Sequence, residues 1–125
     1  MRKDVVQNLC IKRGQLVWVD FKERDGSCQS GKRPAVIIQN DIGNRFSMTT
    51  MVIPITSKNK RDLPVHIKLS KDYDIAYKGN ILMAEQLTVI DKSQILAIGD
   101  ILDEVELKEL DKAMTIQLDL SNNIV

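Results

Sequence analysis

Short apolar runs, separated by polar stretches that contain glycine, fill the first hundred residues of the chain. Residues 15–21, QLVWVDF, are rich in β-branched and aromatic side chains, and residues 34–39, PAVIIQ, are almost continuously apolar. Such runs are typical of β-strands, and a run without polar alternation is typical of a strand covered on both faces. A third and a fourth strand are predicted at residues 49–57 and 64–69, an apolar segment follows at 80–85, and residues 87–90 and 95–101 are predicted as further short strands or turns.

One helix is predicted close to the C-terminus. Asp103 and Glu106 have the spacing of a capping box, and apolar residues follow at helical spacing: Leu107, Leu110, Met114 and Leu118. A series of short strands closed by one helix predicts an α+β, mainly β fold. We expect a small SH3-like antiparallel β-barrel, or a strongly curved sheet, with a C-terminal helix.

Polar segments between the predicted strands indicate loops. Residues 22–33 contain two glycines and no hydrophobic period, which predicts a long loop, and residues 58–62, KNKRD, form a second charged loop. Residues 40–47, NDIGNRFS, are expected to turn the chain. Pro54 lies inside the predicted third strand, and because proline cannot donate to a ladder we expect it at an edge or a bulge.

Length and composition indicate one globular domain. The chain has 125 residues, of which 43% are hydrophobic and 28% charged. We expect a loosely held arm at 1–12, a barrel with its helix at 13–120 and a tail at 121–125. There is no run of about 18 apolar residues that could span a membrane. No secretory signal is evident and the two cysteines form no CxxC pair, so a reducing cytoplasm is expected.

Several classes of active site are excluded by the residue inventory. The single histidine, His66, excludes sites that need two histidines from one chain. No glycine pattern of a dinucleotide fold or a phosphate loop is present, so neither of these two kinds of nucleotide-binding site is expected. Residues 1–99 carry 16 Lys and Arg against 10 Asp and Glu, whereas residues 100–125 carry 2 against 7. This asymmetry is compatible with a polyanion-binding face, or with an acidic, solvated surface helix.

The basic residues of the first half fall mainly in the predicted loops. If the fold brings these loops together, they form a positive rim suited to a phosphate backbone; otherwise they are solvated surface charges. Arg33 is distinctive because Pro34 keeps it extended at the start of a buried strand. Its guanidinium could grip phosphate with a fork of donors, or form a structural ion pair.

Five segments together resemble the MazF/PemK family of toxin endoribonucleases. They are RGQLVWVDF (13–21), GSCQSGKRPAVIIQND (26–41), ITS (55–57), NILMAEQ (80–86) and IDK (90–92). The resemblance covers most of residues 12–120, and its most specific part is G-x-R-P followed by an apolar strand. The segment QNDIGNRFS (39–47) is similar to the Gram-positive branch of the family.

The resemblance implies a dimeric PemK-type barrel that cleaves single-stranded RNA at short motifs without a metal ion or a cofactor. In such toxins the 2′-hydroxyl attacks the adjacent phosphorus and leaves 2′,3′-cyclic phosphate and 5′-hydroxyl ends. The family's catalytic arginine and threonine fall on Arg33 and Thr56. The implied partners are the RNA substrate, a second copy of the chain and a MazE-like antitoxin with an acidic C-terminal segment, together with which the toxin would bind DNA; a membrane partner is not implied.

RNA contacts are expected from loop cations and from hydroxyl and amide side chains, since amides can read the edges of unstacked bases. The candidates are Lys22, Arg24, Ser27, Gln29, Lys32, Asn40, Arg45, Ser57, Lys58 and Gln86. Because only 4% of the residues are aromatic, Trp18 is expected in the core or at a dimer interface rather than as a stacking platform. His66 is expected to be structural.

One residue departs from the family pattern. Many members carry a glutamate where this chain has Cys28, so the acceptor of the 2′-hydroxyl proton is unassigned. A cysteine could replace the carboxylate only as a thiolate; the alternative is an uninvolved thiol. Two other functions stay open at this point: a non-catalytic toxin of the same fold that acts on a protein such as DNA gyrase, and an RNA-binding barrel without turnover.

Overall fold

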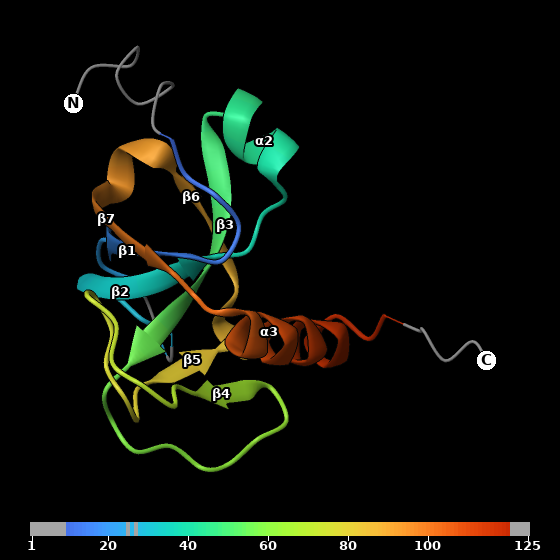
Figure 1. The fold of residues 1–125 in the computed structure, drawn as a ribbon. Coiled ribbons are helices and arrows are strands. Elements are labelled where there is room, and N and C mark those ends of the chain that lie inside the picture. Colours follow the sequence, from blue (N-terminus) through green and yellow to red (C-terminus); the bar gives the residue numbers. More distant parts are fainter. Residues whose placement is uncertain (1–9, 25, 27, 121–125) are drawn as a thin grey trace.

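The computed structural model describes residues 10–24, 26 and 28–120. It contains a bent antiparallel sheet with one long helix packed against it (Figure 1). The strands are β1 (Gln15–Asp20), β2 (Lys32–Ile37), β3 (Thr49–Thr56), β4 (His66–Lys68), β5 (Ile81–Met83), β6 (Thr88–Asp91) and β7 (Ile95–Ile101). The helices are α2 (Asp41–Phe46) and α3 (Glu104–Gln117), with 3-10 turns η1 (Ala84–Gln86) and η2 (Lys92–Gln94). These elements confirm the mainly β fold with a C-terminal helix.

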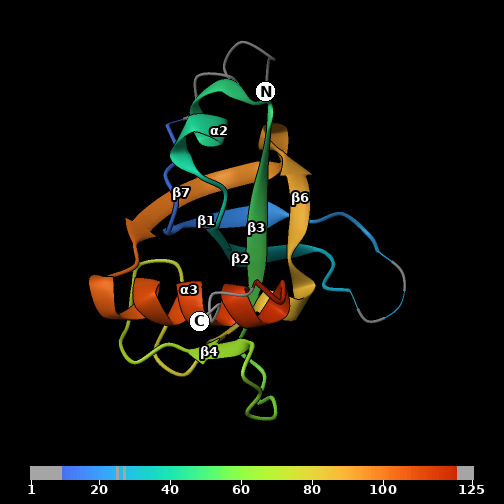
Figure 2. The ribbon, with the colours of Figure 1, turned by 90° about the vertical axis from the view of Figure 1, so that its right-hand side faces the viewer.

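The strand order is β4-β5-β3-β2-β1-β7, and β6 also pairs with β3. Every pairing is antiparallel. Among the described residues the outer strands β4 and β7 do not pair, so the sheet is strongly curved without closing into a barrel. Figure 2 shows α3 crossing beneath the long, nearly upright β3, next to β4.

Two apolar clusters lie on the two faces of β1, β2 and β3. The larger cluster contains Leu16, Val36 and Ile53 together with Leu110 of α3, all completely buried. The second cluster takes the alternate positions of the same strands, Val17, Ala35 and Val52, and also Ile11, which is 5% exposed. The continuous apolar run at 34–39 is therefore explained by burial on both faces, as predicted. Ile11 is packed in this cluster although it falls in the segment predicted as a loose arm; residues 1–9 and the tail 121–125 lie outside the described residues.

The segment predicted as a polar turn at 40–47 contains the short helix α2. Asn40 caps its N-terminus, because its Oδ1 accepts the Gly43 N–H at 2.8 Å. Asn44 is 1% exposed, and its Oδ1 accepts the Thr50 hydroxyl at 2.7 Å. The polar residues of this segment therefore satisfy backbone and buried groups of a helix, which is why their polarity alone did not distinguish a helix from a loop.

Beneath α2 lies a completely buried cation. The Lys92 side chain is 0% exposed, and its Nζ donates a hydrogen bond to the Asn44 carbonyl at the C-terminal half of α2. A cation near a helix C-terminus is favourable, but removal from water penalises the charged form. Burial therefore lowers the pKa of Lys92.

Pro54 lies at the centre of the sheet, so the prediction of an edge or bulge position was wrong. It pairs with Ala35 of β2. On the other side of β3, β6 pairs with Thr49–Val52 and β5 with Ile55 and Thr56, so no ladder residue lies opposite Pro54. The Met51 carbonyl accepts the Ile38 N–H, so the backbone polar groups of Met51 point toward β2. Backbone polar groups point to alternate sides along a strand, so the nitrogen of Pro54 points away from β2, to the side where the partner of β3 changes from β6 to β5. The missing N–H therefore costs no ladder hydrogen bond.

Helix α3 starts where the sequence predicted. Asp103 is its N-cap, with Oδ1 accepting the Glu106 N–H at 3.0 Å, and this hydrogen bond lowers the pKa of Asp103. The Glu106 side chain, however, is buried and accepts the Tyr73 hydroxyl at 2.8 Å instead of reaching back to the cap. Burial, aided by Glu106, raises the pKa of Tyr73 to about 12. In the described part of the chain, no helix is long and apolar enough to cross a membrane.

Candidate functional site

Arg33 lies in the first half of β2, opposite Val19 of β1, and is half-buried. Its Nε donates to the Ser30 carbonyl at 2.9 Å, which fixes the plane of the guanidinium. Within the described ranges, no carboxylate forms an ion pair with Arg33. The two terminal nitrogens therefore keep their donors for a ligand, and the structural ion pair considered from the sequence is not formed there.

Thr56 is the last residue of β3 and is only 2% exposed. Its Oγ1 accepts the Lys58 N–H at 3.2 Å, so the hydroxyl hydrogen can still be donated elsewhere. The β2–β3 ladder pairs Ala35 with Pro54, and the same register continued by two residues sets Arg33 opposite Thr56. Residues opposite each other in an antiparallel pair project from the same face. The ladder ends at Pro54, however, and the next residues of β3, Ile55 and Thr56, pair with β5 on the other side of the strand.

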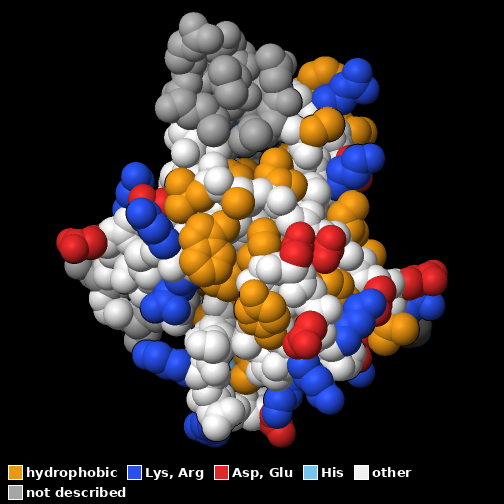
Figure 3. Space-filling model, turned by 60° about the vertical axis from the view of Figure 1, so that its left-hand side comes forward, with side chains coloured by type: hydrophobic (Ala, Val, Ile, Leu, Met, Phe, Trp, Pro, Cys, Tyr) orange, Lys and Arg blue, Asp and Glu red, His pale blue; other side chains and the backbone are white. Residues whose placement is uncertain are grey.

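An open pocket of about 300 Å³ lies beside Arg33. Its polar lining includes Arg33, Lys32, Ser57 and Asn80, and its apolar lining includes Trp18, Pro34, Ile55, Ile75 and Tyr77. Thr56 does not line it, although both of its chain neighbours do. Figure 3 shows this side of the molecule, with hydrophobic side chains at the centre, mainly Lys and Arg to their left, and both acidic and basic side chains to their right.

Trp18 lies outside both core clusters and is half-buried, so of the two expected positions the core is not the one observed, and the dimer interface stays a prediction. Tyr77 is 56% exposed. Sequence analysis missed Ile75, Tyr77 and Asn80 as site residues. The only local signal was the Gly79–Asn80 turn, which says nothing about what the turn faces.

The loop between β1 and β2 is attached to the segment 86–88. Arg24 donates from Nη2 to the Thr88 hydroxyl and from Nη1 to the Gln29 carbonyl, each at 3.4 Å. The Gln86 Oε1 accepts the Gln29 N–H at 3.2 Å. Three predicted RNA contacts, Arg24, Gln29 and Gln86, therefore lie together and hold the loop. The Gln29 Oε1 is buried without a hydrogen-bond partner in the described structure.

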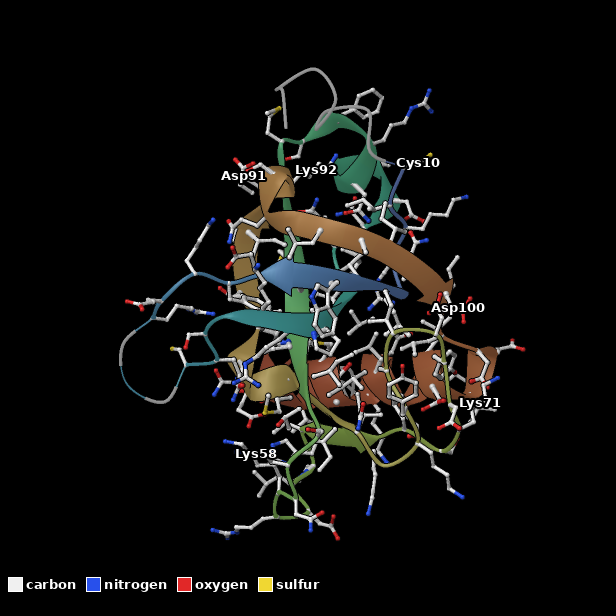
Figure 4. The ribbon with its side chains drawn as sticks, turned by 90° about the vertical axis from the view of Figure 1, so that its left-hand side faces the viewer. Cys10, Lys58, Lys71, Asp91, Lys92 and Asp100 are labelled. Carbon is white, nitrogen blue, oxygen red and sulfur yellow. The ribbon has the colours of Figure 1, made fainter. Side chains whose placement is uncertain are left out.

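Of the remaining predicted RNA contacts, some lie at the pocket beside Arg33 and others do not. Lys22 pairs with Asp20 at 3.3 Å, and the Lys22 N–H lowers the pKa of that carboxyl. Lys32 and Ser57 line the pocket, and Figure 4 shows Lys58 where the chain leaves β3. Ser27 lies outside the described residues, and Cys28 is an exposed free thiol.

Asn40 and Arg45 are not brought to this site. They belong to the cap and last turn of α2, which follows the opposite end of β2 from Arg33 (Figure 1). The Arg45 guanidinium lies over the Phe46 ring at 5.3 Å from its centroid. Both residues thus have local structural roles in the chain.

His66 has partners on both ring nitrogens: Glu85 Oε2 at 2.7 Å from Nε2 and the Arg61 carbonyl at 2.8 Å from Nδ1. This fits the expected structural role. Among the described residues, no group of three or more His, Cys, Asp and Glu is arranged to hold a metal ion.

Comparison with known proteins gives one family and a consistent fold. A family model described as "PemK-like, MazF-like toxin of type II toxin-antitoxin system" matches residues 12–118. Similar solved structures include an endoribonuclease in complex with its cognate antitoxin from Mycobacterial species, with 18% identity, a TM-score of 0.73, and coverage of 90% of this chain and 98% of that one. Another is MazF (Form-I) from Deinococcus radiodurans, with 21% identity, a TM-score of 0.76, and coverage of 90% and 100%. At these identities the structural likeness shows the fold.

Proposed function

The chain belongs to the PemK-like, MazF-like family of toxins of type II toxin–antitoxin systems, and we propose that it is the endoribonuclease of such a pair. It cleaves single-stranded RNA at a short sequence motif without a metal ion. One similar protein, the mycobacterial chain solved in complex with its cognate antitoxin, is described as an endoribonuclease, which supports this activity.

The observation that carries the proposal is that the terminal nitrogens of Arg33 are free to bind a ligand. Its guanidinium is held by one backbone contact and has no carboxylate partner in the described structure. Its terminal N–H groups lie beside an open pocket, where they can bind an oxyanion. Cleavage passes through a phosphorane with extra negative charge, and donors aimed at such charge usually make the largest catalytic contribution. Thr56, two residues beyond the end of the β2–β3 ladder and between the pocket residues Ile55 and Ser57, is the proposed hydroxyl donor.

The reaction balances without another reactant. The 2′-oxygen forms a bond to phosphorus, the bond from phosphorus to the 5′-oxygen breaks, and one proton moves from the 2′-hydroxyl to the leaving 5′-oxygen. A guanidinium stays charged in proteins, so Arg33 acts as an electrostatic clamp rather than as the proton donor. The proton passes through water or another group, and Cys28 is an exposed candidate on the adjacent loop.

We further propose that the toxin acts as a homodimer in the cytoplasm and is neutralised by a MazE-like antitoxin with an acidic segment. The strand β7 lies at the edge of the sheet and exposes Leu96, Ile98 and Ile101, a surface suited to pairing with a second copy. The loop cations suit an acidic antitoxin, which would compete with RNA for one surface.

The test is to incubate the protein with a long transcript in the presence of EDTA and to map the cleaved ends. We expect cuts at one short motif, with 2′,3′-cyclic phosphate and 5′-hydroxyl termini, and no cut where the ribose at that point is replaced by 2′-deoxyribose. Intact RNA across many sequences would refute the proposal and favour a toxin that acts on a protein target.

A further inference from the structure

The pocket beside Arg33 contains two of the five aromatic side chains of the chain, Trp18 and Tyr77. Of the other three, Phe21 and Tyr73 are buried and Phe46 lies on α2 under Arg45. Neither Trp18 nor Tyr77 belongs to a core cluster. Their exposure in one pocket is therefore not explained by packing, and exposed apolar patches of this kind mark interaction sites.

We propose that Trp18 and Tyr77 form a stacking subsite for one unpaired nucleobase, next to the phosphate that Arg33 binds. The inference rests on the proposed ribonuclease function and adds where a base of the substrate sits. Unstacked bases are commonly held on aromatic faces, and the pocket volume of about 300 Å³ is at the small end of ligand sites, which suits one base.

The wall that carries Tyr77 is fixed to the sheet. The Asp74 Oδ1 accepts the Asp100 N–H at 2.9 Å, and the Asp100 Oδ2 accepts the Asp74 N–H at 3.3 Å. Gly99 allows this contact, since a Cβ at that position would lie 2.5 Å from the Ile75 side chain. Figure 4 shows Asp100 and Lys71 on this side of the molecule, where the loop after β4 lies against the end of β7. The aromatic wall is therefore preformed, which lowers the entropic cost of binding.

Polar groups at the rim can recognise the edge of the base. The Asn80 Oδ1 accepts the Tyr77 N–H at 2.9 Å, and the Asn80 N–H donates to the Tyr77 carbonyl at 2.9 Å. This orients the Asn80 amide and leaves its NH₂ group as a donor, and the Ser57 hydroxyl lies in the same lining. Donors of this kind match the carbonyl oxygens of a base, so stacking would supply affinity and these groups orientation.

The charges favour a nucleotide as the occupant over a second copy of the chain. Arg33 and Lys32 are part of the pocket lining itself, and in the described structure neither forms an ion pair. A phosphate joined to the stacked base would neutralise them, because phosphate and base are adjacent parts of one nucleotide. A second copy would have to supply acidic groups at this point.

The test uses the fact that Trp18 is the only tryptophan. Its fluorescence is followed during titration with a short RNA that carries the mapped motif and a 2′-deoxyribose at the cut, and with single-stranded homopolymers of each base. We expect quenching by single strands but not by the same RNA in a duplex. An abasic nucleotide next to the cut should abolish the quenching and raise Kd about tenfold or more, and abasic nucleotides elsewhere should not.

Variants separate the subsite from the rest of the site. Tyr77→Ala should raise Kd about tenfold, Tyr77→Phe should bind like the wild type, and Phe46→Ala, which removes an exposed aromatic ring on α2, should change nothing. Unchanged Kd and quenching in Tyr77→Ala, or a fluorescence change that depends on protein concentration and dimer formation but not on RNA, would overturn the subsite. These binding readouts do not need cleavage, so uncut RNA with base-dependent quenching would refute the nuclease and retain the subsite.

Discussion

Replacement of Arg33 by lysine isolates the contribution of the guanidinium fork. The substitution keeps one positive charge at the site but removes the planar pair of terminal nitrogens and the Nε contact to the Ser30 carbonyl. Because Nε is already engaged in the free protein, only the two terminal nitrogens can grip the phosphorane, and a lysine offers one mobile point charge in their place. The loss of one oriented donor to a developing oxyanion costs about 10²–10³ in rate, or roughly 3–4 kcal/mol.

We therefore expect Arg33→Lys to cleave about 10²-fold more slowly than the wild type at saturating RNA, and Arg33→Gln to cleave more slowly still. Single-turnover cleavage of the mapped oligonucleotide measures the rate, and thermal unfolding checks that β2 is intact. Lys68→Ala, which removes an exposed charge on β4, is the matched control and should cleave normally. A cleavage rate of Arg33→Lys within about threefold of the wild type would refute the role of the paired terminal nitrogens, because a single point charge would then be enough for catalysis.

Three further predictions concern the site and the buried polar groups. Thr56→Val should lower the single-turnover rate about 10²-fold, whereas Thr56→Ser should retain most of it. The pKa of Lys92 is lower in the folded protein than in the unfolded chain, so the unfolded chain binds more protons between these two pKa values. The free energy of unfolding of the wild type should therefore rise with pH up to about 10.5, where the unfolded lysine titrates, and urea unfolding of Lys92→Met should lack this rise. The folded pKa of Tyr73 is about 12 against 10 when unfolded, so its contribution is complete below pH 10 and should decline by ~2–3 kcal/mol as the pH rises through 12, a loss that Tyr73→Phe should not show.

Much of the fold was predictable because its elements have strong local signals. All seven strands fall on apolar runs, and α3 begins at the residue whose carboxylate caps it. The helix α2 was missed because six residues are too short to show a helical period. Its cap, Asn40, was visible in the sequence, but asparagine favours turns as strongly as helix N-termini.

The site was predictable only in part, since its parts meet through long-range pairing. Pro34 marked Arg33 locally, but its position relative to Thr56 depends on the register of β2 and β3, which no short segment specifies. Trp18 and Tyr77 are separated by 58 intervening residues and reach one pocket only because a loop packs against Gly99 of β7. The low aromatic content argued against stacking, yet it could not show that two of the few rings converge.

Pro54 links the fold to the proposed chemistry. A strand that pairs with β6 in its first half and with β5 at its end must change partners, and a residue without an N–H can occupy the change without leaving a donor unpaired. The β2–β3 ladder also ends at Pro54, two residues before Thr56. Beyond it, Arg33 and Thr56 lie outside the β2–β3 ladder, and Arg33 lines an open pocket. Pro54 thus lets β3 serve two halves of the sheet at the point where its ladder to β2 ends, and the proposed chemistry requires a phosphodiester to reach Arg33 and Thr56 just beyond that point.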